Sequence, residues 1–267
     1  MTDIDILKRF QVFDDYIFDE EPHIYTYKGE IVGTSGSQLI EEYQEPFDAE
    51  RIAPFTAKKL NMSADEVLDM WKTDNLISQV KGTHLHAYME NLTANKLYRY
   101  PEAEIRNNFG YDVLEEYWFP ITIMMEDFKE YARKFLIPIR SELIIGDPEF
   151  DIAGAVDQIY YNTQTEELEV WDWKTNKEIK YEGYKHKKLL GILSDLEDCN
   201  YVHYSIQLNI YKYILQKMTG LKFGKCRIVW FNEKNDTYQI IDCLDLYDRA
   251  EQMLLERRDK INGLSSS

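Results

Sequence analysis

Residues 171–174 read Trp-Asp-Trp-Lys, and residues 154–157, a short way upstream, read Gly-Ala-Val-Asp. Both segments lie in apolar stretches of strand length, and the polar residues 162–166 between them predict a turn. The two stretches are therefore predicted to form adjacent antiparallel strands. Because side chains alternate along a strand, Asp172 and Lys174 share one face and lie roughly 7 Å apart along the chain. Two charges on one face of an apolar strand need an explanation.

The carboxylate of Asp157 supplies one explanation, because a hairpin brings it towards Asp172. Two neighbouring carboxylates repel and raise each other's pKa, and a divalent cation relieves that conflict. Hard oxygen ligands favour Mg²⁺ or Mn²⁺, and Gly154 leaves room for a close approach of backbone or substrate. A simpler interpretation stays open, in which Asp172 and Lys174 form a surface ion pair and Asp157 lies beside the turn.

Helical and strand patterns surround this pair of strands. Upstream, the patterns predict a hairpin over residues 23–32 and the start of a helix near Gln38. Residues 47–100 have a helical pattern, with a capping box at Ser63 and Glu66. Within and after this stretch, separate helices are predicted over residues 81–97 and 121–136. Strands are predicted over residues 141–145, 150–161, 167–174, 225–231 and 238–241, helices over residues 201–218 and 247–261, and a disordered tail over residues 265–267.

These elements predict the α/β class in its mixed α+β form, with a central mixed β-sheet flanked by helices and a helical N-terminal part. We expect two regions that pack as one structural unit. Residues 1–80 form an N-terminal hairpin and helical region, and residues 81–267 form the core with a C-terminal helix.

Composition favours a soluble, cytoplasmic protein. The chain of 267 residues has 44% hydrophobic residues, no apolar run of membrane-spanning length and no basic-then-apolar leader at its N-terminus. Its three cysteines, Cys199, Cys226 and Cys243, are widely spaced and odd in number, which argues against a disulfide framework. Three cysteines also cannot provide the four thiolates of an ordinary iron–sulfur cluster.

The net charge of −17 argues against a nucleic-acid partner. Binding depends on the local field, however, and residues 174–188 read KTNKEIKYEGYKHKK, with six lysines against two glutamates. A solvated loop explains this stretch as simply as a phosphate-binding surface does.

Two helical motifs carry further polar side chains. His86 and Glu90 are four residues apart and share a helix face, as do Gln207 and Tyr211. Each pair could join a functional site, or could be a hydrogen-bonded pair in the core.

Taken in order, five motifs resemble the RecB-like branch of the PD-(D/E)XK nuclease superfamily. They are Gly82-Thr83-x-x-His86-x-x-x-Glu90, then Glu142, then Gly154-x-x-Asp157, then Asp172-x-Lys174, then Gln207-x-x-x-Tyr211. The resemblance covers about residues 82–231. The region before the His86 motif is similar to phage-encoded and mitochondrial single-strand exonucleases of this branch. The four-cysteine cluster of some relatives is absent from this sequence, which argues against an iron–sulfur version.

The resemblance implies a restriction-endonuclease-like core and a role for each matching residue. His86, Asp157 and Asp172 would bind the metal, with the backbone carbonyl of Trp173 completing the set and Glu142 as a secondary ligand. Lys174 would orient or help deprotonate the attacking water and stabilise the transition state.

The remaining motif residues would act on the substrate. Glu90 would orient the helix-borne part of the site, and Gln207 and Tyr211 would position DNA or brace the site. Candidate phosphate contacts are Lys177, Lys180, Lys185, Lys187 and Lys188.

The leading hypothesis is a Mg²⁺- or Mn²⁺-dependent DNA exonuclease that acts on single-stranded DNA or DNA ends in replication, recombination or repair. A phage-encoded enzyme in the host cytoplasm fits this hypothesis, with DNA and a replication or recombination protein as partners. Two alternatives remain: an endonuclease of the same fold, and a DNA-binding module without catalysis.

Overall fold

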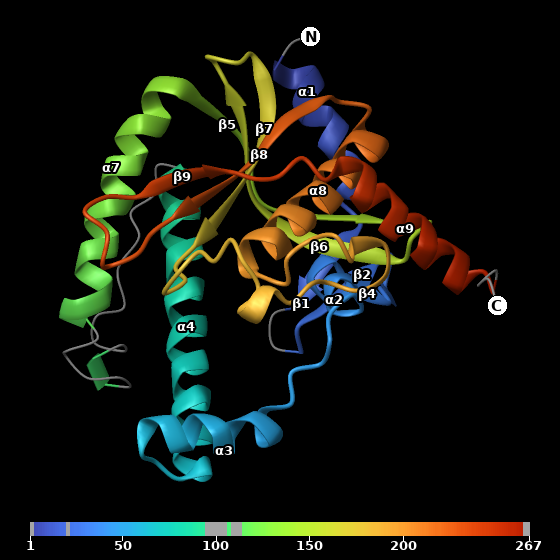
Figure 1. The fold of residues 1–267 in the computed structure, drawn as a ribbon. Coiled ribbons are helices and arrows are strands. Elements are labelled where there is room, and N and C mark those ends of the chain that lie inside the picture. The colour runs from blue at the N-terminus through green and yellow to red at the C-terminus, as the bar shows by residue number, and fades with distance from the viewer. Residues whose placement is uncertain (1–2, 20–21, 94–105, 108–113, 264–267) are drawn as a thin grey trace.

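The computed structural model describes residues 3–19, 22–93, 106–107 and 114–263. Within this part of the chain, a six-stranded mixed sheet forms the centre of the molecule (Figure 1). Its strands are β4 (Thr34–Ser35), β5 (Leu136–Asp147), β6 (Ile152–Asn162), β7 (Glu167–Lys174), β8 (Phe223–Trp230) and β9 (Gln239–Asp242). The pairs β5–β6, β6–β7 and β8–β9 are antiparallel, and β4–β6 and β7–β8 are parallel. The predicted central mixed sheet flanked by helices is confirmed.

The predicted antiparallel pair at the centre is also confirmed. β6 and β7 pair from Gln158 with Trp171 to Asn162 with Glu167. By contrast, β5 is longer than the strand predicted over residues 141–145. Its first residues pair with the end of β6, and this pairing extends the strand beyond what the local pattern indicates.

Helices cover both faces of the sheet (Figure 1). On one face lie α2 (Gly36–Glu41), α8 (Asn200–Thr219) and α9 (Tyr247–Ile261), and on the other lie α4 (Ala64–Thr93) and α7 (Phe119–Phe135). Strand β7 contributes to both cores: Val170 belongs to the core that also contains Ile206 of α8, whereas Trp171 and Trp173 pack with Phe128 of α7. Because side chains alternate, the even-numbered residues of β7 point towards α8.

The N-terminal part begins with α1 (Asp3–Arg9) and the short helix η1 (Phe10–Phe13), followed by a three-stranded sheet of β1 (Tyr16–Asp19), β2 (Ile24–Tyr27) and β3 (Glu30–Ile31). The β2–β3 pairing confirms the predicted hairpin. The sequence patterns had not predicted α1 or β1. Short helices η2 (Leu114–Trp118), η3 (Tyr184–His186) and η4 (Gly191–Leu193) connect later elements.

A projecting pair of helices, α3 (Ala49–Leu60) and α4, follows the N-terminal sheet (Figure 1). The capping box before α4 is present, since Glu66 N–H donates to Ser63 Oγ at 3.2 Å and Ser63 N–H donates to Glu66 Oε2 at 2.7 Å. The prediction of a separate helix from residue 81 is wrong, because α4 runs without a break from residue 64. Leu85 and Met89 anchor the second half of α4 in the core.

The structure does not test some of the sequence-based expectations. The predicted end of that helix at residues 94–97 and the tail over residues 265–267 lie outside the described residues. The division between residues 80 and 81 falls inside α4 and stays a prediction. In the part of the chain that is described, no helix combines the length and the apolar character needed to cross a membrane.

Candidate active site

Side chains from three separate elements converge at one point. His86 comes from α4, Glu142 from β5 and Asp157 from β6. His86 Nδ1 lies 3.3 Å from Glu142 Oε1 and 3.5 Å from Asp157 Oδ1. One potential ligand atom from each residue lies within 4.8 Å of the others. An imidazole nitrogen and two carboxylates at this spacing fit a single divalent cation.

Asp157 lies just beyond the point where the pairing of β6 with β7 ends. The pairing between these strands ends at Gln158 and Trp171. Beyond it, the Trp173 N–H donates instead to Asp157 Oδ2 at 2.7 Å. The side chain is only 7% exposed. The backbone bond therefore fixes one carboxylate oxygen, and the other faces His86.

Glu142 carries a strained backbone, with a φ of 45°. This left-handed conformation costs a non-glycine residue on the order of 1 kcal/mol. Ladder pairs on both sides, Ser141 with Gln158 and Leu143 with Val156, hold the residue in place. Strain of this kind tends to accumulate at functional sites, and here it coincides with the convergence of three potential metal ligands.

Next to this trio, Asp172 and Lys174 form a buried ion pair. Lys174 Nζ lies 2.6 Å from Asp172 Oδ2 and 4.8 Å from the centre of the Tyr204 ring of α8. The Tyr204 hydroxyl donates to Asn176 Oδ1 at 2.8 Å. The interpretation of Asp172 and Lys174 as a surface pair is therefore wrong, because the Asp172 side chain is 7% exposed and that of Lys174 is 19% exposed.

The two buried carboxylates bind protons more tightly than free aspartates. Burial raises the pKa of Asp172 to about 6, with the charge of Asp157 adding to the effect and Lys174 opposing it. Burial also raises the pKa of Asp157, against the opposing charges of His86 and Lys174. Ionising both groups without a compensating cation is costly, which is the electrostatic condition of a metal site.

For the two basic side chains, His86 and Lys174, the neighbouring charges outweigh the effect of burial on the pKa. Burial favours neutral His86, but the charges of Asp157 and Glu142 outweigh it and raise the pKa of His86 to about 9. For Lys174, burial lowers the pKa, but Asp172 and Asp157 outweigh it, so the pKa lies above its usual value. In the absence of a metal, both groups are therefore cationic at neutral pH. A metal ion that binds His86 must displace its proton.

Gln207 and Tyr211 are hydrogen-bonded neighbours on α8, and the Tyr211 ring packs on β6. Gln207 Nε2 donates to the Tyr211 hydroxyl at 3.1 Å. The Tyr211 ring is buried against two glycines, Gly36 and Gly154, where an added Cβ would lie 2.7 Å and 2.5 Å from the ring. The absence of a side chain at Gly154 thus allows α8 to pack closely on β6, three residues before Asp157.

Gly154→Ala is expected to lower the free energy of unfolding by about 1–3 kcal/mol, because the new methyl group overlaps the Tyr211 ring. Gly82→Ala is the matched control, since a Cβ there meets nothing within 4 Å and alanine favours the helix by up to ~1 kcal/mol. Urea denaturation of both variants checks this. Equal stability of the two variants would contradict the close packing of Tyr211 on β6.

A cleft of about 940 Å³ opens beside His86 and Lys174. One wall is α4, with Asp74, Asn75, Ser78 and Gly82, and the other is the segment from residue 175 to the start of α8. Lys177 and Lys180, two of the predicted phosphate contacts, line it. Lys177 Nζ also reaches across to Asp74 Oδ2 at 2.9 Å.

The other predicted phosphate contacts, Lys185, Lys187 and Lys188, are not among the described residues that line this cleft. Lys187 and Lys188 form ion pairs with Asp198 and Glu197, at 3.0 Å and 2.5 Å. Glu90 is exposed on α4, and among the described residues no contact joins it to the trio.

Three residues beside the trio or along the cleft were missed by sequence reasoning. Tyr25 of β2 lies close enough that, after burial, the charges of Asp157 and Glu142 raise its pKa. His203 lines the cleft, and its ring nitrogen lies 2.9 Å from Asp198 Oδ1. Asn176 orients Tyr204. For His203, its i, i+4 spacing from Gln207 on one helix face is an available sequence signal.

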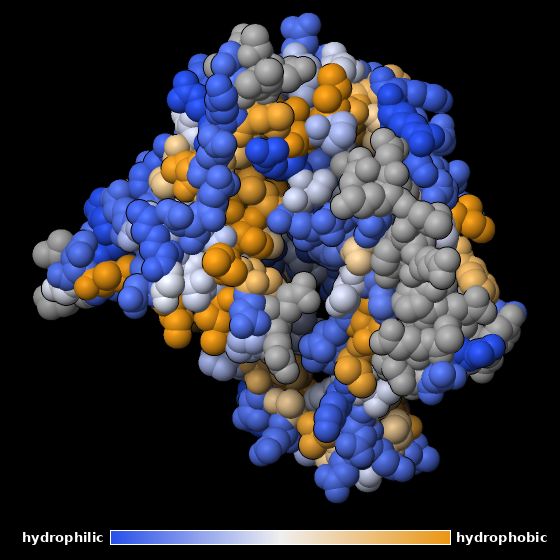
Figure 2. Space-filling model, turned by 180° about the vertical axis from the view of Figure 1, so that it is seen from behind, coloured by the Kyte–Doolittle hydropathy of each residue, from blue (hydrophilic) through white to orange (hydrophobic). Residues whose placement is uncertain are grey.

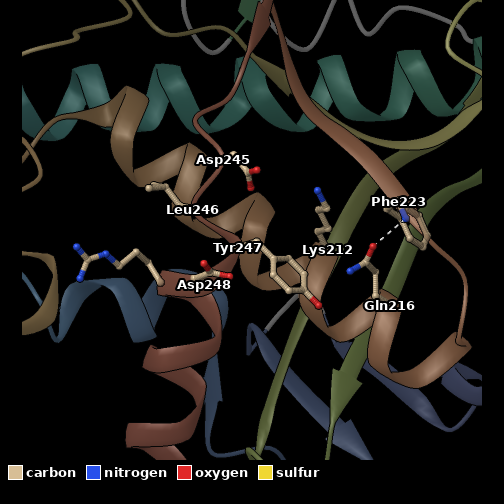
Figure 3. Close-up of a pocket in the computed structure, with 8 residues that line it drawn as sticks. Lys212, Gln216, Phe223, Asp245, Leu246, Tyr247 and Asp248 are labelled. Carbon is tan, nitrogen blue, oxygen red and sulfur yellow. Dashed lines mark hydrogen bonds between the residues drawn. The ribbon is translucent and has the colours of Figure 1, made fainter.

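A separate depression of about 500 Å³ lies between α8 and the start of α9 (Figure 3). Its lining includes Lys212, Asp245 and Tyr247, and Gln216 accepts a hydrogen bond from the Phe223 N–H at 2.9 Å. None of the predicted site residues lines this depression.

Comparison with known proteins gives one family match. A family model for the PD-(D/E)XK nuclease superfamily matches residues 63–263, which include the trio and the Asp172–Lys174 pair. Among curated proteins, none matches the chain.

Two solved structures are similar in part. A "Putative exonuclease" from Eubacterium rectale is 17% identical, with a TM-score of 0.38 over 71% of this chain and 69% of that one. The protein SSO0001 is 14% identical, with a TM-score of 0.32 over 98% of this chain and 86% of that one.

Proposed function

Because the chain belongs to the PD-(D/E)XK nuclease superfamily, whose members are metal-dependent nucleases, we propose that it is a Mg²⁺- or Mn²⁺-dependent DNA exonuclease of the RecB-like branch. The observation that carries the proposal is the convergence of His86, Glu142 and Asp157 beside the buried pair of Asp172 and Lys174. An intact ligand set next to a buried lysine also argues against a catalytically silent module.

The proposed metal site uses ligands that suit Mg²⁺ or Mn²⁺, since carboxylate oxygens dominate it. His86, Glu142 and Asp157 hold the ion, with Asp172 and the carbonyl of Trp173 completing the set. Bound there, a divalent cation supplies positive charge to the scissile phosphate and acidity to the attacking water.

Lys174 acts through its charge in this proposal. Its pKa lies above the usual value, so the ammonium group stays protonated at neutral pH. It can donate to a phosphate oxygen and orient the attacking water, and its charge stabilises the negative charge that develops in the transition state. The ion pair with Asp172 and the ring of Tyr204 fix its position beforehand.

The walls of the cleft favour a single strand as the substrate. The cleft lies between α4 and the segment after β7, and the Asp74–Lys177 ion pair crosses it. A strand that enters from one end meets Lys177 and Lys180, the local positive charges of an otherwise acidic chain. This arrangement favours free ends over internal positions. We place the enzyme in the cytoplasm, in DNA replication, recombination or repair, and plausibly in a phage-infected host.

The test compares end-labelled linear single strands, closed circular single strands and duplex DNA, with Mg²⁺, Mn²⁺ or a chelator. We expect linear single strands to be degraded to mononucleotides or short oligomers with metal, and circles to survive. Cutting of circles at a rate similar to that of linear strands would establish the endonuclease alternative. The absence of metal-dependent cleavage from every substrate would establish the silent module.

A further inference from the structure

An aromatic pair stands on the projecting helices, outside the core. Phe47, just before α3, is 69% exposed. Its ring centre lies 5.8 Å from that of Trp71 on α4, with the ring planes at 61°. Trp71 is half-buried against the small cluster of Ala53, Ala57 and Val67. Two aromatic rings held this close at the surface expose large apolar faces that the fold itself does not cover.

The position of Trp71 on α4 connects the pair to the cleft. The α4 residues that line the cleft are Asp74, Asn75, Ser78, Gly82 and His86. At 100° per residue, these positions span one face of the helix, and Trp71 falls near the middle of that face. The aromatic pair therefore lies on the same side of α4 as the proposed metal ligand His86, further out along the helix.

The length of α4 between Trp71 and His86 sets the distance from the aromatic pair to the proposed metal ligand. Fifteen residues separate Trp71 from His86, which corresponds to about 22 Å along α4. A stacked nucleic-acid strand advances about 3.4 Å per nucleotide, so ~6 nucleotides cover this distance, and fewer do so in an extended strand.

We propose that Phe47 and Trp71 form a stacking platform for unpaired bases of the substrate strand, roughly three to six nucleotides from the scissile bond. The inference rests on the proposed function, and it assigns that enzyme a base-binding site remote from the metal. Aromatic rings stack on any base because every base has a π face, so the platform binds without sequence preference. Duplex DNA cannot offer its bases in this way, and the platform therefore selects single strands.

The surface around the projecting helices agrees with a role in binding. Seen from behind, the lower end of the molecule carries hydrophobic side chains between hydrophilic ones (Figure 2). Exposed apolar residues of this region include Phe47, Phe55, Leu60 and Leu76. Lys177 lines the cleft and pairs with Asp74, which lies three positions after Trp71 on α4, so its charge can contact a phosphate of the same strand.

Two variants test the platform. Phe47→Ala removes an exposed ring, so the packing of α3 on α4 stays intact. Phe55→Ala is the matched control: this phenylalanine is 71% exposed, but it lies on the opposite face of α3 from Ala53 and Ala57, which pack against α4. Both variants are assayed on a single-stranded 20-mer and on a p-nitrophenyl ester of thymidine monophosphate, which is too short to reach the platform.

The measured quantity is kcat/KM for the 20-mer divided by kcat/KM for the ester. Phe47→Ala is expected to lower this ratio about 5-fold or more, through a higher KM for the 20-mer. Phe55→Ala is expected to leave it unchanged. For the wild type, abasic sites at the third to sixth nucleotides from the scissile bond should lower the ratio similarly, and Phe47→Ala should add no further loss on that substrate.

An unchanged ratio for Phe47→Ala, or an equal loss for Phe55→Ala, would overturn the platform while leaving the nuclease intact. If the wild type cleaved neither the ester nor the 20-mer with metal, the proposed function itself would fail. The two failures are therefore distinguishable.

Discussion

Lys174→Ala is expected to lower kcat by about 10²- to 10³-fold, because it removes the positive charge preorganised beside the scissile phosphate. The loss should appear in kcat more than in KM, since the ammonium group matters most when negative charge develops in the transition state. In the native protein, Lys174 is fixed by Asp172 at 2.6 Å and by the ring of Tyr204. Steady-state kinetics on single-stranded DNA with saturating Mg²⁺ measures the effect.

The control for this variant is Lys225→Ala. Lys225 lies on β8, outside the cleft, and its partner is the exposed Asp242. It should keep full activity, because exposed pairs of this kind contribute little. The melting temperature of Lys174→Ala must also be measured, since the variant leaves buried Asp172 without its cation. A folded Lys174→Ala enzyme with wild-type kcat would show that the proposed site is not the catalytic one.

Asp157→Asn is expected to abolish Mg²⁺-dependent activity, by about 10³-fold or more, and to raise the melting temperature of the metal-free protein. The activity falls because the proposed metal loses a charged ligand. The stability rises because burial raises the pKa of Asp157, so its ionised form is costly at neutral pH. Asparagine keeps an oxygen that can accept the hydrogen bond from Trp173 N–H. Thermal melts with and without Mg²⁺, together with activity assays, test both parts.

The pH dependence gives a sharper version of the same test. A carboxyl group whose pKa is raised by folding contributes stability below its unfolded value and loses it as the pH rises through its folded value. The stability advantage of Asp157→Asn over the metal-free wild type should therefore grow as the pH rises above the ordinary aspartate pKa of about 4. Two results would contradict Asp157 as a metal ligand with a raised pKa. One is a metal-free variant less stable than the wild type at pH 7, and the other is a variant that Mg²⁺ stabilises as strongly as it stabilises the wild type.

The sequence predicts the centre of this fold well because local signals and tertiary contacts agree there. The alternation of β7 and the polar turn before it are local, and the bounds of β7 and α9 match the predicted ones. The hydrogen bond between Gln207 and Tyr211 follows directly from helical spacing.

Other features depend on contacts between distant segments and leave no local pattern. The positive φ of Glu142 exists because β6 holds the strand on both sides of it. Asp74 meets Lys177 across 103 positions of sequence. Tyr25 reaches the trio only because the N-terminal sheet folds back onto the core. Side chains of these kinds become functional candidates only when the distances are known.

The continuity of α4 has one further consequence. Trp71 and His86 lie on a single helix from Ala64 to Thr93. The rigid helix therefore fixes the distance between the aromatic platform and the proposed metal. A DNA strand long enough to reach both the platform and the proposed metal site is bound at two points. A DNA fragment shorter than the distance between them is bound at the metal site alone. Digestion should therefore slow at a set remnant length, whatever the base sequence. The length of a helix, rather than any recognition of bases, would then determine which fragments this enzyme leaves behind.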